Sequence, residues 1–233
     1  MSANGLVNLS AAIRPKPDPL TKVAQAARES ISVTINIGIY VYDDVEVLDF
    51  AGPYEVFTTA ARMHQRNSRD ERPLFTVFTI GRTLSPVRAR AGLKVDPDYT
   101  INDHPVMDCL VVPGGVITSE MEKPDVIRWI SGQAAPERVI AAVCTGAFLV
   151  AKTGKLAGKQ VTTHWEDIND LKEMFPAVDV LSTLRWVDEG AFVTSAGISA
   201  GIDMSLHMVE RLHSRELAER PALQLDFDWT END

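Results

Sequence analysis

Short runs of apolar, often β-branched residues recur along the chain, and segments with helical spacing separate them. The first run, SVTINIGIYVY at residues 32–42, predicts a buried strand. Further strands are predicted in LFTVFTIG, MDCLVVPGG, VIAAV and KQVTTHW, at residues 74–81, 107–115, 139–143 and 159–165. Strands that alternate with helices build a sheet with helices on its faces. We therefore expect a three-layer α/β/α sandwich with a mainly parallel, flavodoxin-like sheet.

The segments between these strands carry helix and turn signals. Pro53 suits the first turn of a helix, so we expect one to begin near it. Residues 124–135 have amphipathic spacing, and EDINDLKEMFP predicts a helix that stops at Pro176. Residues 93–101 suggest a hairpin-like excursion, and Asp188-Glu189-Gly190 predicts a hairpin turn. The helix in GISAGIDMSLHMVERLH is expected to end the core.

The chain is expected to form one domain, because no repeat, low-complexity tract or linker divides it. We assign residues 31–228 to this domain and residues 229–233 to a C-terminal tail. Residues 1–30 form an N-terminal extension without the apolar core of a secretory signal. The early part of the extension lacks acids, as transit peptides do, but a mobile extension or an arm that docks on a partner subunit is the favoured interpretation.

Composition excludes several classes of function. The net charge of −9 leaves no basic surplus to neutralise nucleic-acid phosphates. No apolar run is long enough to span a membrane, so no membrane partner is expected. Two cysteines in 233 residues are too few for a disulfide framework, which favours a reduced, cytoplasmic setting. No metal-ligand spacing occurs, and no cofactor is expected.

Cys144 lies in AAVCTGAFLVAKTG, where a predicted strand meets a predicted helix. Such a turn exposes the nucleophile in other hydrolytic folds, and Gly146 relieves crowding there. The N-terminus of the following helix favours a thiolate over a thiol. A buried core cysteine is the alternative, since free cysteine is among the most buried residue types. Cys109, inside MDCLVV, lacks such a turn and is assigned to the core.

Three other positions are candidates for site residues. Asp49 in VLDFAGP is flanked by apolar residues, so it is either a tuned acid or the N-cap of the helix near Pro53. Glu46 is a nearby rival but is expected to be more exposed. Gly115, the second glycine of the PGG turn, presents an N–H that could bind an anion. His164 in TTHW is expected to end a strand on the side of Cys144, although a structural role is more common.

Taken together and in order, four segments resemble the ThiJ/PfpI superfamily, within the group related to class I glutamine amidotransferases. They are VLDFAGPYEVF, VVPGG, AAVCTGAFLVAKTGKLAGKQVTTHW and VTSAGISAGIDMSLHMVERL. The resemblance covers about residues 33–227, and within the superfamily it is strongest to bacterial isocyanide (isonitrile) hydratases.

The resemblance implies roles for particular residues. The reactive cysteine of the family falls on Cys144, and the aspartate of the hydratases falls on Asp49. The backbone N–H groups of an oxyanion pocket fall on Gly115 and Thr145. Protease-like members carry histidine where this chain has Thr145, which argues against a protease. The family histidine falls on His164, and its role varies among members.

These roles imply a lyase that adds water to a small-molecule isocyanide and releases an N-substituted formamide through a thioimidate on Cys144. A glyoxalase- or deglycase-type enzyme acting on reactive carbonyls is an alternative, and it would use His164 more heavily as a base. A non-enzymatic thiol or ligand sensor is another. The family also implies a homodimer, with the helix of Asp49 near the interface. Some transcription regulators with a similar sensor domain carry a DNA-binding region after it. Because this chain is acidic and stops at Asp233, we do not expect it to be such a regulator.

Overall fold

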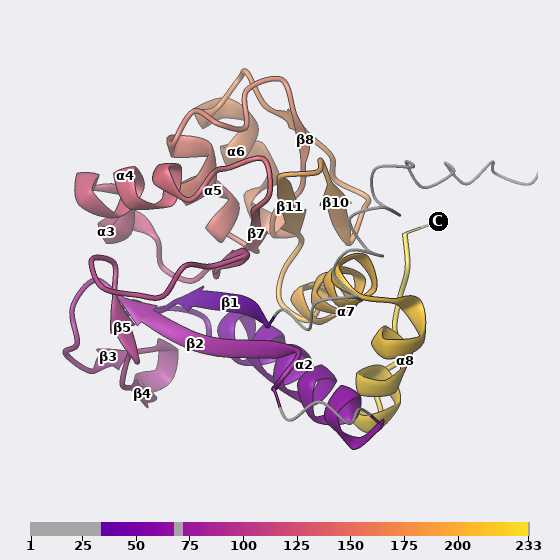
Figure 1. Ribbon diagram of the computed structural model, residues 1–233. Coiled ribbons are helices and arrows are strands. Elements are labelled where there is room, and N and C mark those ends of the chain that lie inside the picture. Colours follow the sequence, from indigo (N-terminus) through magenta and orange to yellow (C-terminus); the bar gives the residue numbers. More distant parts are fainter. Residues whose placement is uncertain (1–33, 68–71, 233) are drawn as a thin grey trace, which may run out of the picture. The chain divides into compact units, whose positions relative to one another are not determined.

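The computed structural model of the protein describes residues 34–67 and 72–232 (Figure 1). Its main sheet has seven strands in the order β10-β11-β7-β6-β1-β2-β5. Neighbouring strands are parallel throughout, except that β10 pairs antiparallel with β11. The strands are β1 (Ile35–Tyr40), β2 (Phe75–Gly81), β5 (Tyr99–Thr100), β6 (Cys109–Val112), β7 (Val139–Val143), β10 (Trp186–Asp188) and β11 (Phe192–Ser195).

Helices cover the sheet in two groups (Figure 1). On one side, α2 (Val47–Asn67), α7 (Ala200–Leu212) and α8 (Arg215–Gln224) pack against one another, and α2 also contacts β1 and β2. On the other side, α3 (Thr118–Met121) and α4 (Pro124–Gly132) contact α5 (Gly146–Lys152), which lies against β6 and β7. The architecture is the expected three-layer α/β/α sandwich.

The central strands are buried on both faces. Every residue of β6 and of β7 is buried, which explains why CLVV and VIAAV read as continuous apolar runs. Because the helices between successive parallel strands lie on the faces of the sheet, the carboxyl ends of β1, β6 and β7 meet at one edge. The loops that follow these strands therefore lie close to one another.

Helix α2 begins earlier than the sequence suggested. It starts at Val47, so Asp49 lies in its first turn and Pro53 lies inside it. The Glu46 carboxylate accepts a hydrogen bond from the Val47 N–H at 3.2 Å, which supports the first turn. Pro53 removes only the bond to the carbonyl four residues earlier. The expectation that the helix begins near Pro53 is therefore wrong.

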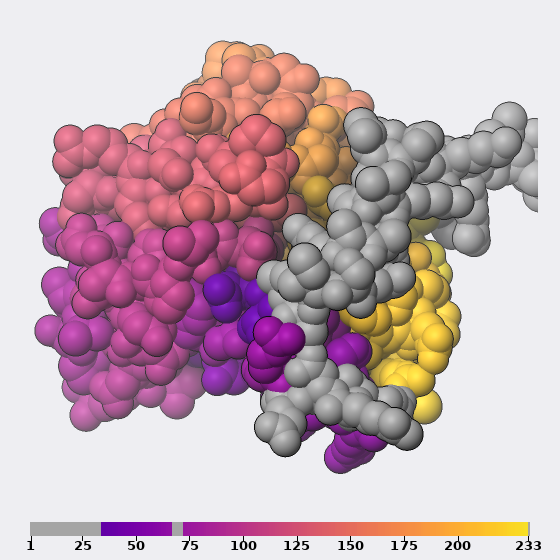
Figure 2. All heavy atoms as spheres, viewed as in Figure 1, coloured from indigo at the N-terminus to yellow at the C-terminus, as the bar shows by residue number. Residues whose placement is uncertain are grey.

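Helix α8 was not expected, because the core was predicted to end with the preceding helix. The sequence RELAERPALQ is highly charged and holds Pro221, so its apolar pattern is weak. Most of its few apolar residues are nevertheless buried, among them Leu217, Ala218 and Ala222. Figure 2 shows the yellow surface of α8 beside the purple surface of α2, which α8 helps to cover.

One predicted strand is shorter than expected and lies outside the main sheet. The strand expected at residues 159–165 is reduced to β8 (Gln160–Val161), which pairs with β9 (Asp179–Val180) outside the main sheet. Its remaining residues run without sheet partners toward a 3-10 turn, η2 (Trp165–Asp167). Helix α6 (Ile168–Met174) follows and ends before Pro176, as expected.

Within residues 93–101, β4 (Lys94–Val95) forms the expected hairpin with β3 (Val87–Arg88), across the 3-10 turn η1 (Arg90–Gly92). Tyr99 and Thr100 instead join the edge of the main sheet as β5. The predicted turn at Asp188-Glu189-Gly190 does connect the antiparallel strands β10 and β11.

The proposed N-terminal extension, residues 1–30, lies outside the described residues. Most of the proposed C-terminal tail is described, and it contacts the domain. The Thr230 N–H donates to Asp203 Oδ1 at 2.7 Å, and the Arg215 guanidinium lies 4.0 Å from the centre of a Trp229 ring. None of the helices in residues 34–67 and 72–232 has the length and apolarity that crossing a membrane requires.

The packing of α7 yields a stability prediction. Leu206 is fully buried in this helix, so Leu206→Ala is expected to lower the free energy of unfolding by about 2–5 kcal/mol. Leu223 on α8 is 83% exposed, so Leu223→Ala should change it by less than about 0.5 kcal/mol. Urea unfolding of both variants compares the same chemical change at a buried and an exposed site. Equal effects would contradict the packing of α7.

Candidate active site

Cys144 occupies the turn between β7 and α5 in a strained backbone conformation. Its φ is +55°, a value that few residues other than glycine adopt. The Cys144 N–H donates to the Ser195 carbonyl at 3.1 Å, and the Thr163 hydroxyl donates to the Cys144 carbonyl at 2.8 Å. A Cβ at Gly146 would lie 2.0 Å from the Val112 carbonyl oxygen, so only glycine fits there. The chain thus holds the cysteine in the sharp strand-to-helix turn expected from the sequence.

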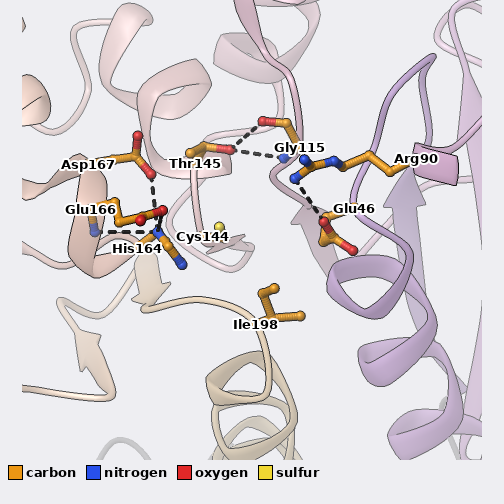
Figure 3. A pocket seen from close by; sticks show the side chains of 9 residues that line it. All are labelled: Glu46, Arg90, Gly115, Cys144, Thr145, His164, Glu166, Asp167 and Ile198. Carbon is orange, nitrogen blue, oxygen red and sulfur yellow. Dashed lines mark hydrogen bonds and ion pairs between the residues drawn. The ribbon is translucent and has the colours of Figure 1, made fainter.

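Cys144 opens into a pocket of about 210 Å³ (Figure 3). Three other residues singled out from the sequence, Gly115, Thr145 and His164, line the same pocket. Five lining residues were not assigned to the site beforehand: Glu46, Arg90, Glu166, Asp167 and Ile198. The side chain of Cys144 is mostly covered, since the residue is 7% exposed. The volume suits a small ligand whose reacting end reaches the sulfur.

Asp49 lies beneath this pocket, fully buried in the first turn of α2. Its Oδ2 accepts a hydrogen bond from the Gly114 N–H at 3.1 Å, whereas its Oδ1 has no hydrogen-bond partner among the described residues. A Cβ at Gly114 would lie 2.9 Å from Asp49 Oδ2 and 2.6 Å from the Thr145 nitrogen. The carboxyl and the cysteine turn therefore meet at Gly114. Asp49 does not cap the helix near Pro53, which was the alternative interpretation.

Burial changes the acid–base properties of both groups. It raises the pKa of Asp49 to about 7, and the charge of Glu46 adds to the rise, while the Gly114 N–H and the Cys144 thiol oppose it. Burial also raises the pKa of Cys144 to about 12, and the charge of Asp49 adds to this, while the Thr145 N–H opposes it. The sequence suggested that the start of α5 favours a thiolate at Cys144. The raised pKa shows that the start of α5 is not sufficient by itself. Formation of the thiolate is coupled to protonation of Asp49.

Thr145 and Gly115 are joined by two hydrogen bonds. The Gly115 N–H donates to the Thr145 hydroxyl at 2.9 Å, and that hydroxyl donates to the Gly115 carbonyl at 3.0 Å. The φ of Gly115 is +141°, and a Cβ there would lie 2.3 Å from the Asp44 carbonyl oxygen. The Thr145 N–H lowers the pKa of Cys144 by hydrogen bonding to its sulfur. The Gly115 N–H, in contrast, already donates to the Thr145 hydroxyl. The use of both N–H groups as anion donors stays a prediction.

His164 lies beside Cys144 and precedes η2, rather than ending a strand as expected. Its Nδ1 accepts a hydrogen bond from the Glu166 N–H at 3.4 Å and lies 3.4 Å from Asp167 Oδ2. Gly197 backs the histidine ring, because a Cβ there would lie 2.3 Å from His164 Cδ2 and 3.0 Å from Cys144 Sγ. His164 is therefore placed to influence the cysteine, although its role stays open.

Hydrogen bonds on the side away from the pocket hold the segment between β11 and α7, which carries Ile198. The Ala196 N–H donates to the Arg185 carbonyl at 2.8 Å, and Arg185 Nε donates to Asp203 Oδ2 at 2.8 Å. Asp203 is fully buried and also accepts the bond from the Thr230 N–H described above. A buried carboxylate with paired oxygens is costly to disrupt. This arrangement fixes the segment between β11 and α7 against the pocket.

The other cysteine and several histidines have structural surroundings. Cys109 is fully buried in β6, and burial raises its pKa to about 12, which confirms its assignment to the core. His104 Nε2 accepts from Trp129 Nε1 at 2.8 Å, and His207 Nε2 lies 2.8 Å from Asp188 Oδ2. Within the described part of the chain, no group of three or more histidine, cysteine and acidic side chains is arranged to hold a metal ion.

The sequence contained a usable signal for some of the pocket residues that were not assigned beforehand, but not for others. Glu166 and Asp167 follow His164 by two and three residues in TTHWED, so the turn after the histidine pointed to them. Glu46 was considered as a rival of Asp49, and with its side chain 20% exposed it is the more exposed of the two. Arg90 comes from a turn without a motif, so only the fold brings it to the pocket. Ile198 lies within the motif VTSAGISAGIDMSLHMVERL, but nothing in that motif gave it a role at the site.

Gly197 yields a prediction about access to the thiol. Gly197→Ala would force the His164 ring to move, because the added methyl group would overlap it. We expect alkylation of Cys144 by iodoacetamide to slow by about tenfold, through overpacking against the sulfur. Gly132→Ala is the matched control, since a Cβ at Gly132 meets nothing within 4 Å. Unchanged alkylation of the Gly197→Ala variant would contradict the placement of the ring.

The buried carboxyl of Asp49 yields a prediction about pH. Its pKa is higher in the folded than in the unfolded chain, so its contribution to stability is complete below pH 4 and is lost as pH rises toward 7. Relative to Asp49→Asn, the free energy of unfolding of the wild type should fall by roughly 2–3 kcal/mol between pH 5 and pH 7.5. Urea unfolding at both pH values measures this difference. A difference that does not vary with pH would rule out the raised pKa.

Comparison with known proteins agrees with this geometry. The isonitrile hydratase of Pseudomonas putida is 33% identical over 196 residues, which cover 84% of this chain and 79% of the hydratase. The HTH-type transcriptional regulator GbdR of Pseudomonas aeruginosa is 32% identical over 183 residues, or 78% of this chain. The match covers 48% of that regulator, so this chain spans about half of its length.

Solved structures share the fold. A THiJ/PfpI family protein from Pseudomonas syringae has a TM-score of 0.73 and 23% identity, over 97% of this chain and 86% of that protein. The model of the DJ-1/PfpI family matches residues 36–211 of this chain. That span includes the cysteine turn, the PGG loop and the start of α2, and it confirms the resemblance derived from the sequence motifs. The chain therefore belongs to the DJ-1/PfpI family.

Proposed function

We propose that this protein is a lyase that adds water to an isocyanide and releases an N-substituted formamide. One observation carries the proposal: a cysteine on a strained turn opens into a small pocket, with a buried acid behind it whose Oδ1 has no partner among the described residues. An isocyanide carbon is electrophilic and suits a soft sulfur nucleophile. Similarity to an isonitrile hydratase supports this choice of substrate.

In the first step, the proton of the Cys144 thiol passes to the Asp49 carboxylate. A carboxyl with a pKa of about 7 can both accept and return a proton near neutral pH. The Cys144 sulfur then forms a bond to the terminal carbon of the isocyanide, and Asp49 returns the proton to that carbon. The product of this step is a thioimidate that links the carbon to Cys144.

In the second step, Asp49 takes a proton from water as the water oxygen attacks the thioimidate carbon. Asp49 passes this proton to the substrate nitrogen, and it then takes the hydroxyl proton of the adduct as the carbon–sulfur bond breaks and the formamide leaves. Cys144 recovers its proton from Asp49, so the pair ends as it began. The Thr145 N–H, which acts on the sulfur, supports negative charge there. His164 orients groups at the mouth of the pocket.

Other features of the protein are proposed on the basis of the family. We infer a homodimer with α2 near the interface, a cytoplasmic location and a domain that spans residues 31–228. The substrate is a small molecule.

A ligand sensor is the second candidate function, and a specific observation favours it. The chain is 32% identical to part of a transcriptional regulator, so the same fold and similar residues serve regulation in a relative. In a sensor, Cys144 or its pocket would bind a ligand without turnover. Measurement of turnover therefore separates the two candidates.

Formation of formamide from p-nitrophenyl isocyanide tests the proposal. We expect wild-type turnover and a loss of at least about 1,000-fold in kcat/KM for Cys144→Ala, because the nucleophile is removed. Asp49→Asn keeps the shape of the side chain but cannot carry the proton, so a loss of roughly 100-fold or more is expected.

Cys109→Ala is the matched control, since Cys109 lies in the core away from the pocket and should keep activity within about threefold. Substantial turnover by Cys144→Ala would overturn the mechanism. If the wild type with a reduced thiol converts methylglyoxal but no isocyanide, carbonyl chemistry replaces the proposal. If it converts neither, the sensor does.

A further inference from the structure

We propose that the pocket selects its ligand by charge: it admits uncharged and cationic isocyanides and rejects anionic ones, and Glu166 and Asp167 set this selection. The inference rests on the proposed function for the identity of the reacting group. The selection itself depends only on the side chains that line the pocket. It therefore defines a substrate class that the cysteine and its acid do not specify.

Carboxylates dominate the charged lining of the pocket. Glu46, Glu166 and Asp167 face it, and Arg90 is its only arginine or lysine among the described residues (Figure 3). The lining thus carries two more negative than positive charges when His164 is neutral. Protonation of His164 would reduce this excess but would not remove it. Any ligand that approaches Cys144 therefore meets a negative potential.

The arginine already has an anionic partner, which offsets its charge, although its side chain is 55% exposed. Arg90 lies 3.2 Å from Glu46 Oε2, and both lie on the side of the sulfur away from Glu166 and Asp167 (Figure 3). An anion that took Arg90 from Glu46 would leave that carboxylate, with its side chain 20% exposed, without this partner. Such an exchange of partners gains little, because one paired carboxylate replaces another.

The opposite wall lacks a strong cation. Glu166 Oε2 and Asp167 Oδ2 lie 3.8 and 3.4 Å from His164 Nδ1, and this histidine carries a charge only when it is protonated. The Glu166 side chain is 64% exposed, so it reaches the mouth, whereas that of Asp167 is 32% exposed and lies deeper. A cationic substituent at the mouth would approach these two carboxylates directly.

The effect of these charges is already visible within the site. Burial raises the pKa of Asp167, and the charges of Asp170 and Glu166 add to the rise, while His164 opposes it. The charge of Asp167 also contributes to the raised pKa of Cys144. Charges in a cleft with low-dielectric walls act more strongly than on an open surface. The same field acts on any charged group carried by a ligand.

Charge-selective labelling of Cys144 tests the inference without turnover. Methanethiosulfonates transfer a thioalkyl group to a thiolate, so that a disulfide forms and methanesulfinate leaves. Methyl, 2-(trimethylammonio)ethyl and 2-sulfonatoethyl reagents supply neutral, cationic and anionic probes of this reaction. Each rate is divided by the rate with free 2-mercaptoethanol to remove differences in reactivity. Cys144→Ala serves as the blank.

We expect the corrected rate of the cationic probe to exceed that of the anionic probe by about tenfold or more at low ionic strength, and salt to reduce the ratio. Glu166→Gln and Asp167→Asn should each lower the ratio several-fold. Glu173→Gln removes the same charge from an exposed position on α6 outside the pocket, so it should leave the ratio unchanged. Equal corrected rates for the cationic and anionic probes would overturn the inference.

Turnover of isocyanides that carry a neutral, an ammonium or a carboxylate substituent separates this inference from the proposed function. Charge-selective labelling without turnover of any isocyanide would reject the hydratase function and keep the selection. Turnover at equal kcat/KM for the ammonium and carboxylate substrates would keep the hydratase function and reject the selection.

Discussion

The close approach of three loops at Gly114 is the constraint on which the site depends. A side chain at this position would collide with the Asp49 carboxylate and with the backbone of Thr145. Asp49 and Cys144 come from segments that are far apart in sequence, and the missing side chain lets them meet. The parallel order of β1, β6 and β7 makes this meeting possible, because it brings their carboxyl ends to one edge.

Burial then links the chemistry of the two groups. The cover that α2 and the loops provide raises the pKa values of both Asp49 and Cys144, so neither is readily ionised by itself. A charge on one disfavours a charge on the other, and the pair exchanges a proton more easily than it loses one. Asp49 Oδ1, which has no hydrogen-bond partner among the described residues, can accept this proton. An orphaned buried oxygen, which is usually a cost to stability, has a reason at this site.

Local sequence patterns were sufficient for some parts of the molecule. The apolar runs predicted the central strands because both of their faces are buried, and the strand–cysteine–helix pattern located Cys144. Patterns failed where tertiary contacts decide the structure. Helix α8 forms on few apolar contacts despite Pro221, and Arg90 reaches the pocket from a turn whose position depends on a hairpin. For the pKa of Asp49, the sequence indicated only the direction of the shift. The size of the shift depends on how completely the fold buries the carboxyl.

Asp203 joins segments that are synthesised at different times. Arg185 and Asp203 itself lie in the last third of the chain, and Thr230 follows them by more than twenty residues. Chains fold as they are made, beginning from the N-terminus. The wall around Ile198 therefore gains its last anchor only after every strand of the sheet has been produced. During biosynthesis, Cys144 can be in place before the pocket around it is complete.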